Sequence, residues 1–113
     1  MKRYSLTVDL KDDAQLIAEY EEYHKEIWPE IRKSIVEAGV LDMQIFRLGN
    51  RLFMIMETVD DFSFDKKAAM DAANPTVQKW EQMLWKYQQP IAGSKPGEKW
   101  RLMDKIFSLN QSI

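Results

Sequence analysis

Hydrophobic and polar residues alternate at the start of the chain, and this period changes to a helical one after residue 13. The alternation over residues 3–10 predicts a half-buried strand. Its apolar face consists of Tyr4, Leu6, Val8 and Leu10. Residues 14–38 repeat apolar side chains at helical spacing, but Pro29 interrupts them because proline disfavours helical geometry at the preceding residue. We therefore expect a helix that breaks near Trp28, restarts at Pro29 and ends at Gly39.

Two further runs, residues 40–48 and 51–58, predict a β-hairpin. The Gly49-Asn50 pair between them is a two-residue loop typical of a type II′ turn. One face then carries Met43, Ile45, Leu52, Met54 and Met56, and the other carries Phe46, Phe53 and Ile55. Because both faces are substantially apolar, we expect helices to cover one face and a second subunit to cover the other.

The remaining pattern completes an α+β fold. Residues 63–73 are helical in pattern, Asn74 caps a further helix over 75–88, and a loop rich in Pro and Gly leads to a last strand over 99–109. The order β-α-β-β-α-β is the ferredoxin-like arrangement with an antiparallel sheet. We expect one domain over residues 1–113, of the dimeric α/β-barrel type in which two sheets pair about a two-fold axis.

Composition narrows the classes of partner. The net charge is −2 with acidic and basic residues interspersed, so the sequence predicts neither nucleic acid nor an anionic membrane as a partner. The chain has no cysteine, which excludes disulfides, thiol catalysis and thiolate metal sites. The first residues contain no apolar signal region and no apolar run approaches 18 residues, so we expect a cytoplasmic protein.

His24 is the one histidine of the chain and the first candidate for catalysis. An imidazole both donates and accepts protons near pH 7. Tyr20 lies four residues earlier, which places both side chains on one helix face with Cβ atoms about 5–6 Å apart. A lone histidine on a helix is more often structural than catalytic, so spacing alone leaves both interpretations open.

Two motifs point to a known family. They are Tyr20-x-x-x-His24 followed by Ile27-Trp28-Pro29-Glu30, and Gln78-Lys79-Trp80. With these motifs the chain resembles the L-rhamnose mutarotase family, small dimeric ferredoxin-like proteins that interconvert sugar anomers. The resemblance covers nearly the whole chain. It implies that His24 is the acid/base residue and that Tyr20 and Trp80 bind the sugar.

Two positions depart from the rhamnose enzymes at places that touch the sugar in that family. Glu81 stands where those enzymes have a second tryptophan, and Met43 stands where they have a tyrosine. The variant resembles family members associated with L-fucose. Fucose and rhamnose are both 6-deoxy-L-hexoses that differ at C2 and C4, and a glutamate in place of an aromatic residue changes which hydroxyls are read. The resemblance therefore predicts a 6-deoxy-L-hexose substrate and leaves open which of the two.

Mutarotation opens the pyranose ring and closes it on the other face. One group protonates the ring oxygen while another removes the proton of the anomeric hydroxyl, and neither a cofactor nor a metal takes part. His24 supplies one of these groups, and Tyr20, Glu81 or water supplies the other. Two alternatives remain at this point. One is a non-catalytic sugar-binding or dimeric interaction domain, and the other is a haem-binding or cofactor-free monooxygenase of the related dimeric barrels.

Overall fold

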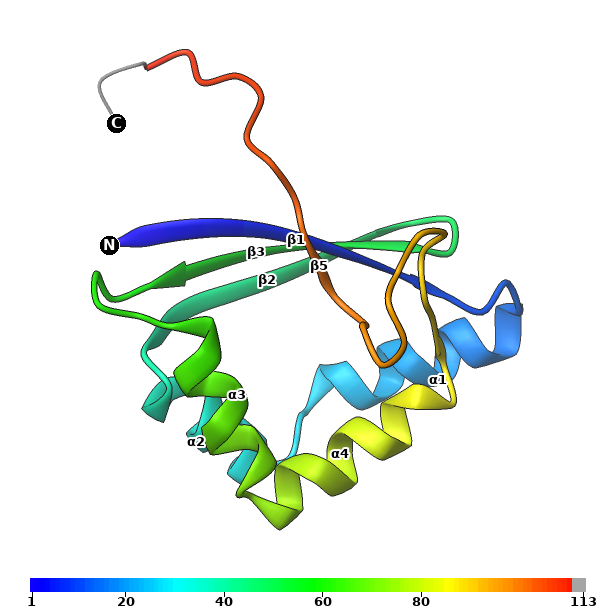
Figure 1. Cartoon of the computed structure of the whole chain (residues 1–113). Coiled ribbons are helices and arrows are strands. Elements are labelled where there is room, and N and C mark those ends of the chain that lie inside the picture. Colours follow the sequence, from blue (N-terminus) through cyan, green and yellow to red (C-terminus); the bar gives the residue numbers. More distant parts are fainter. Residues whose placement is uncertain (111–113) are drawn as a thin grey trace.

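The computed structural model describes residues 1–110 and shows an antiparallel sheet with its helices gathered on one face (Figure 1). In chain order the elements are β1 (Lys2–Leu10), α1 (Ala14–Lys25), α2 (Pro29–Glu37), β2 (Val40–Leu48), β3 (Arg51–Thr58), α3 (Phe64–Ala72), α4 (Pro75–Trp85), β4 (Gln88–Gln89) and β5 (Arg101–Leu102). No helix within the described residues is long and apolar enough to cross a lipid bilayer.

The strand order confirms the ferredoxin-like arrangement. The sheet runs β2-β3-β1-β4, and the short β4 and β5 both pair antiparallel with β1, one after the other along the same edge. This single chain forms an open sheet, so the barrel type stays a prediction. One face of the sheet is covered by helices, as the patterned alternation of β1 and β3 predicts.

The predicted break between the first two helices is confirmed. Helix α1 ends at Lys25 and α2 begins at Pro29, with Trp28 in extended geometry as its N-cap. Gly39 follows α2 with a φ of +99°, and a Cβ placed there would lie 2.9 Å from Cγ2 of Val59. Both the positive φ and this close approach require glycine.

The hairpin also follows the sequence. Gly49 has a φ of +60°, and within the described residues every positive φ belongs to a glycine. Asn50 therefore has a negative φ. A positive φ at the first turn residue and a negative φ at the second are what a type II′ turn requires. A bulge between Val40 and Asp42 shifts the register at the start of β2. The predicted inner face is buried or half-buried against the helices, whereas Phe46 on the outer face is 51% exposed.

Two predicted boundaries are wrong. The helix expected to reach residue 88 ends at Trp85, because the backbone N–H of Lys11 binds the carbonyl of Tyr87 at 2.8 Å and draws residues 88–89 onto the edge of β1. The strand expected over 99–109 is confined to Arg101–Leu102. The last hydrogen bond of this segment to the sheet is donated by the Met103 N–H to the carbonyl of Ser5. Alternating apolar and polar residues do not form a strand where no neighbouring strand pairs with their backbone.

The interior of the described chain divides into two buried clusters. The first core lies toward the β4 end of β1 and consists of Val8, Leu10, Tyr20, Ile31, Leu52, Val77, Trp80, Leu84 and Tyr87. The second core lies toward the loop after β3 and consists of Leu6, Val40, Met54, Met56 and Phe62. Only the first core contains residues that the sequence marks for function.

Candidate active site

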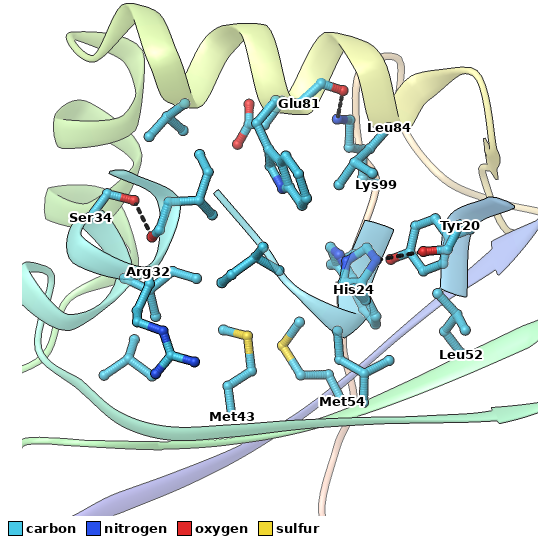
Figure 2. Close-up of a pocket in the computed structure, with 18 of the residues that line it drawn as sticks. Tyr20, His24, Arg32, Ser34, Met43, Leu52, Met54, Glu81, Leu84 and Lys99 are labelled. Carbon is cyan, nitrogen blue, oxygen red and sulfur yellow. Dashed lines mark hydrogen bonds between the residues drawn. The ribbon is translucent and has the colours of Figure 1, made fainter. Parts of the chain in front are cut away.

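A cavity of about 1110 Å³, open to solvent, lies between the helices and the inner face of the sheet (Figure 2). All five residues that the sequence predicts for the site line it: Tyr20, His24, Met43, Trp80 and Glu81. They come from α1, β2 and α4, so the fold brings together side chains separated by up to 61 positions (81 − 20) in the sequence. Whether each contacts a sugar stays a prediction.

The imidazole of His24 is held by its own helix. Its Nδ1 lies 2.8 Å from the backbone carbonyl oxygen of Tyr20, one turn earlier in α1. A carbonyl oxygen only accepts, so Nδ1 carries the proton and donates it, which leaves the Nε2 lone pair of the neutral ring unprotonated. Burial lowers the pKa of His24 from its ordinary value of 6.5, and the bond to Tyr20 partly opposes that shift. At neutral pH the ring is therefore a base.

Aromatic rings from two helices fix the orientation of this imidazole. The Tyr20 ring stacks on it with centroids 4.3 Å apart, and the Trp80 ring of α4 approaches it edge-on at 5.7 Å. Tyr20 is 3% exposed and Trp80 is 6% exposed, so both belong to the first core as well as to the cavity wall. The ring of Trp28, at the helix break, lies 4.9 Å from that of Trp80 in an edge-on contact.

The hydroxyl of Tyr20 is poorly suited to proton transfer at neutral pH. Burial raises the pKa of Tyr20 to about 12, against a smaller opposing effect of a hydrogen bond from the Gln88 side chain. A group that holds its proton this tightly loses it only at a large free-energy cost near pH 7. The geometry therefore favours a supporting role for Tyr20, in which it stacks on His24 and supplies the carbonyl that fixes its tautomer.

Lys99 is a cavity residue that the sequence analysis did not identify. It precedes β5, and its Nζ donates to the carbonyl oxygen of Glu81 at 2.9 Å while lying 4.6 Å from the centre of the Trp85 ring. Burial lowers the pKa of Lys99, and the negative charge of Glu81 acts in the opposite direction. No motif marks this lysine, because its position depends on how the loop before β5 folds back over α4.

The floor and the far end of the cavity differ from the His24 end. Figure 2 shows Met43 and Met54 opposite Glu81 and Lys99. Thioethers of the sheet therefore face a polar rim formed by α4 and the segment before β5. Arg32 and Ser34 of α2 lie at the end away from Tyr20. A half-buried ion pair between Lys67 and Asp71 of α3 also lines the cavity, with 2.6 Å between its charged atoms.

Metal ligands are not clustered in the described part of the chain. Within residues 1–110, no group of three or more His, Cys, Asp or Glu side chains is arranged to hold a metal ion. We therefore assign no metal site. The chemistry that the cavity offers is a neutral imidazole, an ammonium group, a carboxylate and aromatic faces suited to the C–H side of a small polar ring.

Comparison of the sequence with known proteins identifies a family of sugar mutarotases. A profile of the L-rhamnose mutarotase family matches residues 3–109. The chain is 44% identical to a protein named L-fucose mutarotase from Xanthomonas campestris pv. campestris, over 100% of this chain and 92% of that protein. It is 35% identical to an L-rhamnose mutarotase of Phocaeicola vulgatus, over 85% of each chain. Its fold is similar to the crystal structure of an L-rhamnose mutarotase from Formosa agariphila, with a TM-score of 0.69 at 20% identity and coverage of 96% and 99%.

Proposed function

The chain belongs to the L-rhamnose mutarotase family and is an enzyme that interconverts sugar anomers, and we propose that its substrate is L-fucose and that His24 is its base. The observation that carries the role of His24 is the bond from Nδ1 to the Tyr20 carbonyl, because it leaves Nε2 free in the cavity. The family assignment does not favour a non-catalytic binding domain. A haem protein of the same fold draws no support from either comparison of sequence.

The proposed reaction uses His24 in both directions. Nε2 takes the proton of the anomeric hydroxyl while the ring oxygen receives a proton and the bond from C1 to that oxygen breaks, giving the open-chain aldehyde. Rotation about the C1–C2 bond presents the other face of the carbonyl. Closure returns the proton from Nε2 to the new anomeric hydroxyl. The lowered pKa of His24 keeps Nε2 available to begin this cycle at neutral pH.

Glu81 and Met43 support L-fucose over L-rhamnose. The two sugars differ at C2 and C4, and these two residues stand at the positions where the rhamnose enzymes carry aromatic residues. Met43 is half-buried on the cavity floor and Glu81 is half-buried on the opposite wall. The carboxylate of Glu81 accepts hydrogen bonds from sugar hydroxyls, whereas the carbon face of an indole ring at this position does not. The flexible thioether of Met43 leaves space that a tyrosine ring fills. The 44% identity to a protein named L-fucose mutarotase agrees with this choice.

We also propose that the protein is a homodimer. Phe46, Phe53 and Ile55 lie on the face of the sheet that no helix within residues 1–110 covers, and the ring centroids of Phe46 and Phe53 are 6.4 Å apart. The segment after β5 adds exposed apolar side chains, among them Ile106 at 96%. A second copy buries these surfaces most simply, since a two-fold axis places the same face on itself.

Saturation-transfer proton NMR of anomer exchange tests the function. Wild-type protein accelerates exchange of L-fucose more than that of L-rhamnose when each is presented alone and when both compete. His24→Ala lowers the rate by roughly 10²–10⁴-fold, because a positioned general base typically contributes that much to a rate. The variant remains folded. The matched control is Glu22→Ala, which changes an exposed side chain of the same helix that does not line the cavity. Faster exchange of L-rhamnose contradicts the substrate, and full activity of His24→Ala contradicts the mechanism.

A further inference from the structure

We propose that Lys99 is the second proton carrier of the reaction, the general acid that protonates the ring oxygen while His24 acts on the anomeric hydroxyl. This inference rests on the proposed mutarotase function. It deepens that function, because the residues alone left Tyr20, Glu81 and water as candidates and did not include a lysine.

The position of Lys99 is fixed by two independent contacts. Nζ donates to the carbonyl of Glu81 at 2.9 Å and lies over the Trp85 ring at 4.6 Å. An ammonium group has three N–H donors, and within residues 1–110 this one has a single hydrogen-bond acceptor, the Glu81 carbonyl. The side chain is half-buried and lines the cavity, so its remaining donors are available to an oxygen of a bound sugar.

Lys99 and His24 each contact the same turn of α4. Glu81 follows Trp80 directly in α4, and the Trp80 ring lies 5.7 Å from the His24 ring. Lys99 and His24 line one cavity from different elements, the segment before β5 and the last turn of α1. The hydroxyl oxygen and the ring oxygen are both bonded to the anomeric carbon, so the reaction needs an acid and a base that reach one carbon from two directions. We assign these two roles to Lys99 and His24, which line the cavity from the segment before β5 and from α1.

The protonation states of the two groups are complementary. Burial lowers the pKa of Lys99 from its ordinary value of 10.5, against the opposing charge of Glu81, so its ammonium group releases a proton more readily than that of an exposed lysine. Burial also lowers the pKa of His24, which leaves its imidazole neutral at pH 7. Tyr20 is the weaker candidate, since its pKa is raised to about 12 and its ring is 3% exposed.

The proton balance closes without any further reactant. In ring opening, Lys99 Nζ gives a proton to the ring oxygen, the C1–O bond pair moves to that oxygen, and Nε2 of His24 takes the proton of the anomeric hydroxyl. In closure on the other face, the C5 hydroxyl attacks C1, the neutral amine of Lys99 takes its proton, and His24 returns a proton to O1. Both residues end each turnover in their starting states.

Lys99→Arg is the decisive variant. Arginine keeps the positive charge, the donor to Glu81 and the stack on Trp85, but it does not release a proton in this pH range. Lys99→Met removes the charge as well, and Lys95→Met changes an exposed lysine of the same loop that does not line the cavity. For each variant, kcat and KM for L-fucose are measured by anomer exchange from neutral pH to just above 10.5, with the uncatalysed rate subtracted.

We expect Lys99→Arg and Lys99→Met to lower kcat by about 10²-fold with KM changed by less than about threefold, and Lys95→Met to match wild type. Wild-type kcat should fall at a pKa below 10.5, and both Lys99 variants should lack this limb. The proposal is overturned if Lys99→Arg has the same kcat as the wild type, or if kcat of the wild type does not fall at alkaline pH. Either result leaves the proposed function intact if wild type accelerates exchange and His24→Ala does not. If wild type itself is inactive, the function fails first.

Discussion

The two cores of this chain are both built from apolar and aromatic side chains, but they differ in how far they contribute to the site. The second core packs Phe62 and the methionines Met54 and Met56 under the loop after β3, and Phe62 contacts Tyr4 and Phe64 without lining the cavity. The first core contains Tyr20 and Trp80, which are almost fully buried and yet form the wall around His24. Val40 and Met54 of the second core also line the cavity, but Leu6, Met56 and Phe62 do not. The second core therefore serves mainly stability, while the first core serves stability and chemistry together.

This difference follows from the size of the chain. A domain of 113 residues buries a limited fraction of its surface and has little interior to devote to an enclosed site. Its cavity must share walls with the core, so the rings that orient the imidazole are also the rings that hold α1 against α4. His24 itself is half-buried and contributes less to packing. A substitution at His24 should therefore lower mainly the activity, and one at Phe62 mainly the stability. A substitution at Trp80 should lower both.

The largest combined effect is expected at Trp80. Trp80→Ala removes a buried indole that contacts Trp28, Tyr23 and His24, so the free energy of unfolding should fall by about 3–5 kcal/mol. The rate of anomer exchange should fall in the same variant, since the imidazole loses its edge contact. Chemical denaturation and exchange NMR at low temperature measure the two quantities.

Phe62→Ala is the matched control in the second core. It should lower the unfolding free energy by a similar amount, about 3–5 kcal/mol, while the folded fraction keeps the wild-type kcat/KM. If Phe62→Ala reduces kcat/KM of the folded protein as much as Trp80→Ala does, the two cores are not functionally distinct.

A smaller effect is expected on the choice of sugar. Met43→Tyr combined with Glu81→Trp restores the residues of the rhamnose enzymes on opposite walls of the cavity. The ratio of kcat/KM for L-fucose to that for L-rhamnose should fall by about tenfold or more, the range in which pocket shape and hydrogen bonding act. Lys33→Tyr places the same ring on the exposed face of α2, outside the cavity, and should leave the ratio unchanged. An unchanged ratio in the double variant shows that specificity is read elsewhere.

The smallest effect concerns pH. Because burial lowers the pKa of His24, kcat/KM should stay level near neutral pH and fall only below a pKa that lies under 6.5. The unfolded chain binds a proton at the ordinary histidine pKa, so stability falls as pH decreases from 6.5 through the folded value, and it is regained above 6.5. His24→Ala should remove this contribution to the pH dependence of unfolding. An acid limb above 6.5 contradicts a neutral, buried imidazole.

Much of the fold could be predicted from local patterns. The break at Trp28, the Gly49-Asn50 turn and the faces of the hairpin follow from proline, glycine and period-two alternation. The ends were harder because they depend on tertiary contacts. Residues 88–89 leave the helix for the edge of β1, and residues 103–109 alternate without a strand to pair with in this chain.

Only the site residues that belong to, or align with, the family's motifs could be predicted from the sequence. His24, Tyr20, Trp80, Glu81 and Met43 were identified from the family resemblance, and all five line the cavity. Lys99 was not, because its place in the cavity depends on a loop of some ten residues that folds back over α4. The tautomer of His24 also required the structure, since it depends on a backbone carbonyl within hydrogen-bond distance of Nδ1.

The most direct test of the central claim uses the fact that the chain has one histidine. Long-range ¹H–¹⁵N correlation NMR of uniformly ¹⁵N-labelled protein reports the tautomer and pKa of that ring without ambiguity. We predict a neutral imidazole at pH 7 with the proton on Nδ1 and an unprotonated Nε2, titrating below 6.5. A ring protonated on Nε2 at pH 7, or a pKa above 6.5, contradicts the assignment of His24 as the base that receives the anomeric proton.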